Sequence, residues 1–377
     1  MKMVRQILKF LFVIDNLSTG GAQRQMINLA LGLTQRGYRV EIFCYMPGDL
    51  LARPLVEAGI PIHWHFKRSR FSLDVILALW KLIGLGDFDL VLSFLSTPNF
   101  YALLTGRIFR LNRVPVIVSE RSCDLPQGVG FWERFVRQFY RFANHIVANS
   151  HHQRITLTEK YPWLKKRLST IYNGYDLETF IPAGAEPNNR PLRLLVIASV
   201  SPYKNGLCLI EALNILRQRD GLILYVDWIG QLVMMGERLQ NLNDMNQTID
   251  NYSLRHQWAW LYQRSDIVEQ LHQHDVLVHP SYVEGLPNVV CEALACARPV
   301  IVSDTLDHAQ LVQDGKSGFL FDHEDPIDLA NKIKLFLNLP IAERREMGQN
   351  GRRFAESHLS KDRLTDDYER LFIAVLN

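Results

Sequence analysis

The chain alternates short apolar runs with longer stretches in which apolar residues recur at helical spacing. Apolar runs bounded by turn residues are typical of strands buried in a parallel sheet, and the amphipathic stretches are typical of helices that cover it. In the first half, the expected strands are KFLFVID, YRVEIFCY, PIHWHF, FDLVLSF, VPVIVSE and HIVANS. The first expected helix is AQRQMINLALGLTQRG, which ends at Gly37. This alternation predicts a doubly wound α/β domain.

The same alternation begins again after residues 181–193, IPAGAEPNNRPLR, which are rich in Pro, Asn and Gly and typical of a linker. Expected elements of the second half are the strands LRLLVIAS, LILYVDWIG, HDVLVHP and RPVIVSD and the helix GLCLIEALNILRQR, with further helices near 326–337 and 344–377. The sequence thus predicts two facing Rossmann-like domains, 1–182 and 183–356, and a last helix, 357–377, that packs back on the first domain. Ligands of open α/β sheets bind at the carboxyl ends of strands, so an interdomain cleft is the expected site.

Composition is that of an ordinary globular protein, with 47% hydrophobic and 21% charged residues among 377. The formal net charge of +3 is too small to indicate nucleic-acid binding. The five cysteines form no C-x-x-C pair, which suits a reducing compartment. No apolar run reaches the roughly 18 residues of a membrane-spanning helix, and the first run ends at Asp15, so it is interpreted as a strand and not a signal peptide. We therefore expect a cytoplasmic protein.

The stretch HPSYVEGLPNVVCEALACARPVIVS places two carboxylates, Glu284 and Glu292, eight positions apart. Pro287 is expected at the first position of a helix, so the main-chain N–H groups of Asn288–Val290 would be unpaired and attract a phosphate. Gly285 lets a ligand approach the backbone. Carboxylates repel phosphate and bind hydroxyl groups, so the order is hydroxyl, phosphate, hydroxyl. A nucleotide-diphosphate sugar has that order, whereas isolated glutamates would be solvated surface acids.

This stretch resembles the E-x7-E signature of the family 4 retaining glycosyltransferases, which have the two-domain GT-B fold. NLSTGGAQRQMINLALGLTQRGYRVEIF, IVANS, IYNGYDLETF and DGKSGFLFDHEDPIDLANKI match further family motifs in the same order, so the resemblance covers nearly the whole chain. It implies that Glu284 contacts the donor sugar and that Glu292 binds the ribose hydroxyls. It also implies that the backbone of Leu286–Val289 holds sugar and phosphate.

Two loops after predicted first strands complete the expected donor site. Gly20 and Gly21 form a pair that is usually only a turn, but the resemblance implies that it faces the donor phosphates. Lys204, in ASVSPYKNG, supplies a point charge for a diphosphate leaving group. Ser199 occupies the position five residues earlier where the family has an arginine, so one cation is missing. The expected donor-binding residues are Gly20, Gly21, Ser199, Lys204, Asn205, Glu284, Gly285, Leu286, Pro287, Asn288, Val289 and Glu292, of which Glu284 and Lys204 are expected to be catalytic.

The acceptor side is expected in the first domain. In IVSERSCD, Glu120 and Arg121 stand where many family members have a histidine, a variant similar to members that act on lipid-linked acceptors. An ordinary surface ion pair between them remains the alternative. Two smaller departures from the family, Ala297 and Gln310 in place of glycine and glutamate, are expected to affect packing only.

The helix FWERFVRQFYRFANH, from Phe131, combines arginines and phenylalanines. Arg134, Arg137 and Arg141 recur on one face, which favours contact with anionic lipid headgroups. An amphipathic helix packed on the sheet is the alternative. The first domain is therefore a candidate for peripheral membrane contact.

The predicted function is transfer of a hexose or N-acetylhexosamine from a nucleotide-diphosphate sugar to a saccharide or lipid-linked saccharide, with retention of configuration. A UDP-sugar is the expected donor. No metal or other cofactor is expected: the DFD sequence, Asp87–Asp89, precedes a strand and lies at the wrong end of the sheet for a metal site. Two alternatives remain open: a weakly active nucleotide-sugar-binding partner of a polysaccharide-assembly complex, motivated by Ser199, and a nucleotide-sugar epimerase. A dehydrogenase is disfavoured because no G-x-G-x-x-G follows either first strand.

Overall fold

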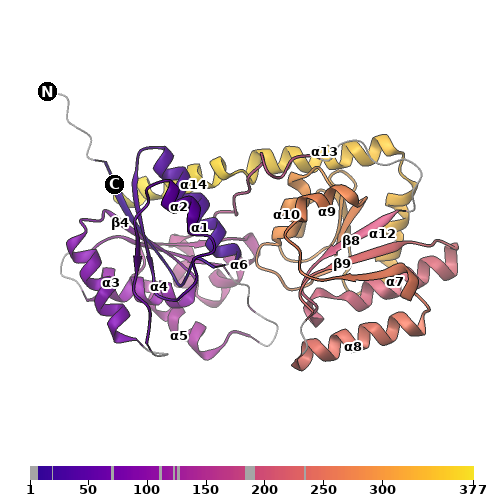
Figure 1. The fold of residues 1–377 in the computed structure, drawn as a ribbon, viewed down its shortest axis with the longest axis horizontal. Helices are drawn as coiled ribbons and strands as arrows, with labels where there is room; N and C mark the ends of the chain where they lie inside the picture. Colours follow the sequence, from indigo (N-terminus) through magenta and orange to yellow (C-terminus); the bar gives the residue numbers. More distant parts are fainter. Residues whose placement is uncertain are drawn as a thin grey trace. The chain divides into compact units, whose positions relative to one another are not determined.

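The computed structural model describes residues 7–18, 20–68, 72–109, 113–121, 124, 128–182, 192–232 and 235–377 (Figure 1). The chain forms two compact units: unit 1 comprises Met1–Gly174 and Lys361–Asn377, and unit 2 comprises Tyr175–Ser360. Most of the predicted linker, residues 183–191, lies outside the described residues.

In the described part of unit 1, seven parallel strands form one sheet in the order β3-β2-β1-β4-β5-β6-β7. Their bounds are β1 Lys9–Ile14, β2 Arg39–Cys44, β3 Ile62–Trp64, β4 Leu90–Phe94, β5 Val116–Glu120, β6 His145–Ala148 and β7 Leu168–Thr170. The first six coincide with the predicted apolar runs, which confirms the doubly wound prediction for this half. The three-residue strand β7 was not predicted, because so short a run carries no alternation.

Helices cover both faces of this sheet (Figure 1). These helices are α1 Gly21–Gln35, α2 Arg53–Glu57, α3 Leu73–Leu85, α4 Ser96–Leu103, α5 Phe131–Phe139, α6 His151–Lys160 and α14 Lys361–Leu376. Alternate residues of β1 belong to two cores: Phe10 and Phe12 pack with α1, α2 and α14, whereas Leu11 and Val13 pack with α3, α4 and α5. A π-helical turn at Leu104–Ile108 and 3₁₀ turns at Tyr140–Phe142 and Pro162–Arg167 precede β5, β6 and β7 respectively.

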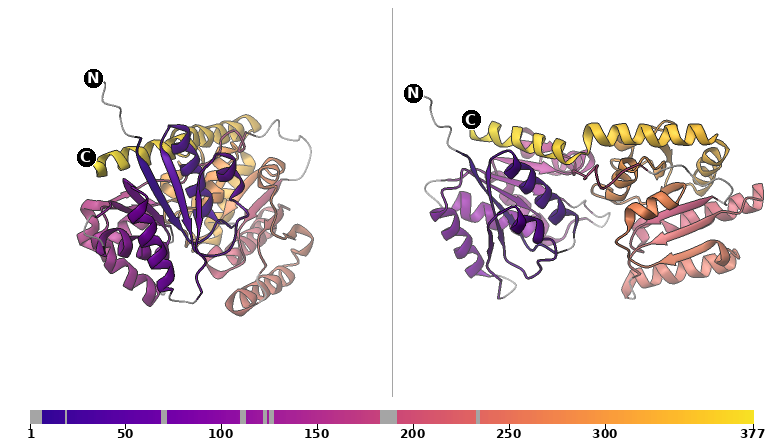
Figure 2. Two further views of the ribbon diagram at one scale, coloured as in Figure 1. Left: turned by 60° about the vertical axis from the view of Figure 1, so that its left-hand side comes forward. Right: turned by 45° about the horizontal axis from the view of Figure 1, so that its top comes forward.

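The last helix, α14, packs on α1 within unit 1 (Figure 2). The ring of Phe372 lies edge-on to that of Phe10, with centroids 4.9 Å apart. Gly32 of α1 allows the close approach, because an added Cβ there would lie 2.3 Å from the Thr365 hydroxyl. At the rim, the Arg36 guanidinium lies 2.6 Å from Asp366. A helix that begins 191 positions after the end of the unit 1 sheet (β7 ends at Thr170, α14 begins at Lys361) thus completes the core of unit 1.

In the described part of unit 2, six parallel strands follow the order β10-β9-β8-β11-β12-β13. Their bounds are β8 Arg193–Ile197, β9 Tyr225–Ile229, β10 Trp258–Leu261, β11 Val276–His279, β12 Val300–Ser303 and β13 Gly318–Phe321. The four predicted strands are present, so the doubly wound prediction is confirmed here too. The sequence did not predict β10 and β13, at the two edges of the sheet.

The helices of unit 2 are α7 Gly206–Asp220, α8 Gly236–Asn251, α9 Ile267–Gln273, α10 Asn288–Ala295, α11 His308–Leu311, α12 Pro326–Asn338 and α13 Ile341–His358. At the start of α12, the Asp325 carboxylate accepts from Ile327 N at 2.8 Å, and Pro326 occupies the first helical position. The prediction that Pro287 opens α10 was wrong by one residue. Pro287 precedes the helix as its N-cap, with ψ of 87°.

Candidate active site

Two loops at the carboxyl edge of the unit 2 sheet lie against each other because β8 and β11 are hydrogen-bonded neighbours. A 3₁₀ turn, Pro202–Lys204, follows β8, and the loop with Glu284 follows β11. Tyr203 O accepts from Tyr282 N at 3.1 Å and from the Ser281 hydroxyl at 3.1 Å. This pairing brings Lys204 into contact with Glu284, 80 positions later in the chain.

Glu284 binds two partners through one carboxylate oxygen. Lys204 Nζ donates to Oε1, and His279 Nε2 lies 3.1 Å from the same atom. The Lys204 and Glu284 side chains are 19% and 17% exposed, so water screens the pair only in part. Burial alone would raise the pKa of Glu284, but the His279 hydrogen bond and the Lys204 charge outweigh it and lower the pKa to about 2. The carboxylate is therefore ionised throughout the physiological range.

The histidine beside this carboxylate is neutral. Burial lowers the pKa of His279 in spite of the neighbouring Glu284, so at neutral pH its Nε2 donates the hydrogen bond and Nδ1 carries no proton. Behind it, the ring of His308 stands perpendicular to that of His279, with centroids 5.5 Å apart. His308 Nδ1 lies 2.8 Å from Ser303 O, and burial lowers the pKa of His308 to about 3. Lys204 is thus the cation that neutralises Glu284.

The start of α10 offers main-chain donors next to this ion pair. The N–H groups of Gly285, Leu286 and Val289 donate to no acceptor within the described residues. Val290 N donates to Pro287 O at 3.1 Å, so its predicted availability to a phosphate was wrong: the chain tightens into a 3₁₀-type turn there. Asn288 is held from the side, because its Oδ1 accepts from the Tyr175 hydroxyl at 2.6 Å.

The other predicted donor residues of unit 2 lie around the same loops. Glu292 is half-buried on α10, within the helix that begins beside Glu284. Asn205 adopts a left-handed conformation with φ of 55°, and its Nδ2 donates to His323 O at 2.8 Å, so its side chain shapes the loop. Ser199 follows β8 and lies against Gly230, where an added Cβ would fall 3.1 Å from Ser199 N. The predicted glycine pair belongs to unit 1, where Gly20 precedes α1 and Gly21 opens it.

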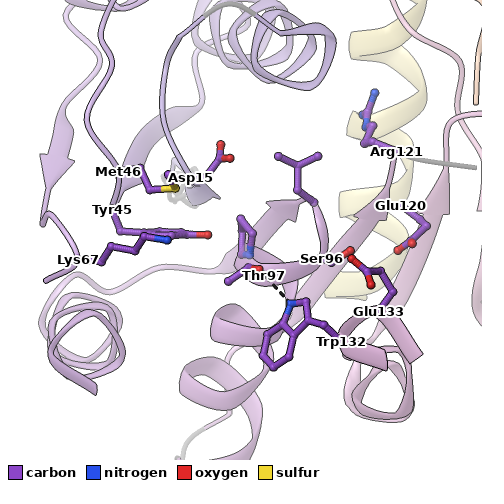
Figure 3. A pocket seen from close by; sticks show the side chains of 12 residues that line it. Asp15, Tyr45, Met46, Lys67, Ser96, Thr97, Glu120, Arg121, Trp132 and Glu133 are labelled. Carbon is purple, nitrogen blue, oxygen red and sulfur yellow. Dashed lines mark hydrogen bonds between the residues drawn. The ribbon is translucent and has the colours of Figure 1, made fainter. Parts of the chain in front are cut away.

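A pocket of about 220 Å³ lies at the carboxyl edge of the unit 1 sheet (Figure 3). Its lining is mixed: Asp15 and Lys67 contribute charges, Ser96 and Thr97 contribute hydroxyl groups, and apolar side chains line the rest. Trp132, at the start of α5, closes one side by donating to the Thr97 hydroxyl at 3.1 Å. Most of its lining residues lie at or after the carboxyl ends of β1, β2, β4 and β5, which is where ligands of parallel sheets bind.

Glu120 also lines this pocket, but the alternative of a surface ion pair with Arg121 is wrong. Glu120 is 1% exposed and pairs with Arg137 of α5 at 2.8 Å, while the Tyr140 hydroxyl donates to its second oxygen. Arg137 reaches Asp124 at 2.7 Å as well. Arg137 is therefore buried, which corrects the prediction that it shares an exposed basic face with other arginines of this helix.

Arg121 turns away from Glu120 (Figure 3). Its guanidinium donates to the Ser119 hydroxyl at 2.9 Å and to the Tyr368 hydroxyl of α14 at 3.0 Å. A further bond runs to Asn173 Oδ1 at 2.5 Å, and the group lies 3.8 Å from the Phe94 ring centroid. These contacts give Arg121 a role in holding α14 to the sheet.

Comparison with known proteins matches both halves of the chain. Residues 19–179 match the family described as Glycosyltransferase Family 4, and residues 178–354 match the family described as Glycosyl transferases group 1. The chain belongs to the family 4 glycosyltransferases. This confirms the family resemblance and the prediction that the protein is a glycosyltransferase.

Curated relatives match this glycosyltransferase over most of its length. One is the N,N'-diacetylbacillosaminyl-diphospho-undecaprenol alpha-1,3-N-acetylgalactosaminyltransferase of Campylobacter jejuni, 24% identical over 86% of this chain and 89% of the relative. Another is the UDP-Gal:alpha-D-GlcNAc-diphosphoundecaprenol alpha-1,3-galactosyltransferase of Escherichia coli, 28% identical over 70% of each chain.

Solved structures show the fold. Anabaena HepE in complex with UDP superimposes with a TM-score of 0.82 at 19% identity, covering 97% of this chain and 100% of HepE. A glycosyltransferase from Rickettsia africae gives 0.82 at 18% identity, covering 99% of each chain. This glycosyltransferase has the GT-B fold, as predicted.

The sequence did not single out His279 or His308. Both lie in or after apolar runs that predict strands, and an isolated histidine in such a run is ordinarily a core residue. A signal was nevertheless present, because His279 ends a predicted strand at the carboxyl edge, five residues before Glu284.

Proposed function

We propose that this glycosyltransferase transfers a hexose or N-acetylhexosamine from a UDP-sugar to a lipid-linked saccharide with retention of configuration. The observation that carries the donor half is the contact of Lys204, Glu284 and His279 beside the unpaired amides at the start of α10. Support for UDP comes from HepE, solved with UDP, and support for the acceptor comes from relatives named for diphospho-undecaprenol acceptors. The enzyme would then work at the cytoplasmic membrane face.

In this proposal the sugar and the diphosphate of the donor bind different groups of the site. Glu284, ionised and fixed by His279, accepts hydrogen bonds from sugar hydroxyls. Lys204 has three N–H donors and gives one to Glu284, which leaves two for the diphosphate. The N–H groups of Gly285, Leu286 and Val289 hold phosphate and sugar oxygens.

The roles of the site residues in the reaction follow from where negative charge develops, which is on the departing diphosphate. The bond between the anomeric carbon and the phosphate oxygen breaks, and the electron pair leaves with UDP. The acceptor hydroxyl forms the new bond to that carbon and gives its proton to the departing phosphate oxygen. Lys204 and the α10 amides stabilise the negative charge on the leaving group. Glu292 binds the ribose, Ser199 gives one neutral hydrogen bond, and no divalent cation is required because Lys204 supplies the positive charge.

The test combines the purified protein with UDP-galactose, UDP-glucose and their N-acetylated forms, with and without a polyprenyl-diphosphate-linked sugar. UDP release that depends on acceptor and persists in EDTA supports the proposal, and NMR of the product gives the anomeric configuration. Isomerised UDP-sugar without transfer would instead indicate an epimerase. UDP-sugar binding without turnover would indicate the weakly active partner that Ser199 suggests.

A further inference from the structure

The helices α3, α4 and α5 cover one face of the unit 1 sheet (Figure 1). Several large apolar side chains of α3, α5 and the adjoining turns are exposed to solvent. On α3, Leu73 is 74% exposed and Leu77 57% exposed, and with Trp80 and Phe109 they line an apolar groove of about 390 Å³. Soluble proteins rarely leave so many large apolar side chains together at the surface without a partner. We call this surface the α3–α5 face; its exposed apolar residues are Leu73, Leu77, Trp80, Phe109, Phe135 and Phe142.

An unbroken series of aromatic rings crosses this face from the pocket of unit 1. Trp132 lines the pocket and stacks on Phe135 with centroids 5.6 Å apart. Phe135 contacts Phe139 at 5.1 Å, and Phe139 contacts Phe142 at 6.3 Å. The far end therefore lies at the 3₁₀ turn that precedes β6, at the opposite edge of the sheet from the pocket.

Four arginines on the same face have no acidic partner among the described residues: Arg107, Arg134, Arg141 and Arg167. Each of them donates to main-chain carbonyl groups instead, as Arg107 does to Phe142 O at 3.1 Å. Burial and the nearby charges of Arg113 and Arg167 lower the pKa of Arg107, so like charges lie close together at this point of the face.

Positively charged residues are also concentrated in the part of the sequence that forms this face. Residues 131–167, from α5 to the turn before β7, contain eight Lys and Arg and two Glu, whereas the whole chain has a net charge of only +3. Exposed aromatic side chains interleaved with arginines are suited to the headgroup region of a bilayer, where rings enter the interface and guanidinium groups contact anionic lipids. An acidic protein surface would satisfy the arginines but would leave the apolar groove beside α3 unfilled.

We propose that the α3–α5 face docks on a bilayer that contains anionic lipids. This inference rests on the proposed function, because a lipid-linked acceptor has to reach the enzyme from a membrane. The aromatic series gives the acceptor a path, since the polyprenyl chain can lie along Trp132, Phe135 and Phe142 while the saccharide enters the pocket of unit 1. The surface that docks on the membrane would thus adjoin the site that binds the acceptor.

The experiment is flotation of the full-length protein with vesicles of phosphatidylcholine, with and without 30% phosphatidylglycerol, in the absence of any substrate. The test variant is Arg107→Gln/Arg141→Gln/Arg167→Gln. The matched control, Arg238→Gln/Arg345→Gln/Lys316→Gln, removes three exposed positive charges from unit 2. Each arginine near an anionic surface contributes a factor of about five, so the test variant should bind about 100-fold more weakly and the control should match the wild type.

Three results would overturn the docking proposal. The first is that the wild type does not bind phosphatidylglycerol vesicles, and the second is that the test and control variants bind them equally well. The third is that the protein does not bind vesicles but self-associates with increasing concentration, and that Phe135→Ser/Phe142→Ser abolishes this self-association. Calorimetric titration with UDP is run on every variant and should be unchanged. A protein that floats with anionic vesicles but binds no UDP would refute the proposed function and leave the docking surface standing.

Discussion

Replacing Glu284 by glutamine tests whether the charge of this residue holds the donor loops together. The side chain keeps its size, but the ion pair with Lys204 and the charged acceptor for His279 are lost. Because Lys204 from the loop after β8 and His279 at the end of β11 both bind this one oxygen, we expect unit 2 to lose stability at neutral pH even without any ligand.

The magnitude follows from the depressed pKa. The carboxyl has an ordinary pKa of 4.5, and in the folded protein the pKa is about 2. That difference corresponds to about 3 kcal/mol of stability at neutral pH. A group with a lowered folded pKa contributes stability above its unfolded pKa and loses it as the pH falls through its folded pKa. The contribution of Glu284 is therefore complete at pH 7, falls by about 2 kcal/mol on going to pH 3, and is absent from Glu284→Gln.

The assay is urea-dependent hydrogen exchange of the β8, β11 and α10 amides, which report on unit 2 alone. Measurements run from pH 7 to pH 3 on the wild type, Glu284→Gln and the control Glu346→Gln, an exposed residue without an ion pair in the described part of the chain. We expect Glu284→Gln to be about 3 kcal/mol less stable than the control at pH 7, with the gap closing towards pH 3. A gap below about 1 kcal/mol at pH 7, or one that stays constant with pH, would refute the reasoning.

Four further outcomes are expected. Lys204→Met should weaken UDP binding about 10- to 100-fold in calorimetric titration, because a charged hydrogen bond to the diphosphate is lost, whereas Lys316→Met should leave it unchanged. Ser199→Arg should tighten UDP binding about tenfold, since it supplies the cation that the family has at this position. Glu292→Ala should raise KM for the UDP-sugar with little change in kcat; transfer with an unaltered KM would contradict a ribose contact. Ala297→Gly should raise the stability of unit 2 by about 1 kcal/mol in thermal unfolding, because Ala297 has φ of 52° and an L side chain is strained there.

Strands that sit inside the sheets were predictable because their apolar runs are long and bounded by turns. The missed strands lie at sheet edges and are short. Within the described residues, Gly318–Phe321 is an edge strand of the unit 2 sheet, and Leu168–Thr170 has three residues. In Trp258–Leu261, two of the four residues are tryptophans, a composition that fits a ligand-contacting loop as well as a strand. In the structure the Trp258 ring stacks on Trp228 of the neighbouring strand, and the Trp260 ring lies tilted to Trp228.

The sequence predicted which residues belong to the donor site but not which of them contact one another. Glu284 and Lys204 were each expected at strand ends, yet their direct contact depends on β8 lying beside β11, which the order of strands along the chain does not specify. Arg137 was misplaced for a related reason. Helical spacing groups it with Arg134 and Arg141, but Glu120 at the end of β5 offers a buried carboxylate that turns Arg137 inward.

The contact between Lys204 and Glu284 also bears on the missing arginine at position 199. Lys204, Glu284 and neutral His279 together carry no net charge, so a bare phosphate entering this site gains little from long-range attraction. A nucleotide sugar changes the balance, because its sugar hydroxyls also donate to Glu284 and partly satisfy the carboxylate, so that more of the charge of Lys204 acts on the diphosphate. Each half of the donor then strengthens the binding of the other. On this argument, the single lysine suffices when sugar and diphosphate arrive together, and UDP-sugar should bind more tightly than UDP by a margin that Glu284→Gln abolishes.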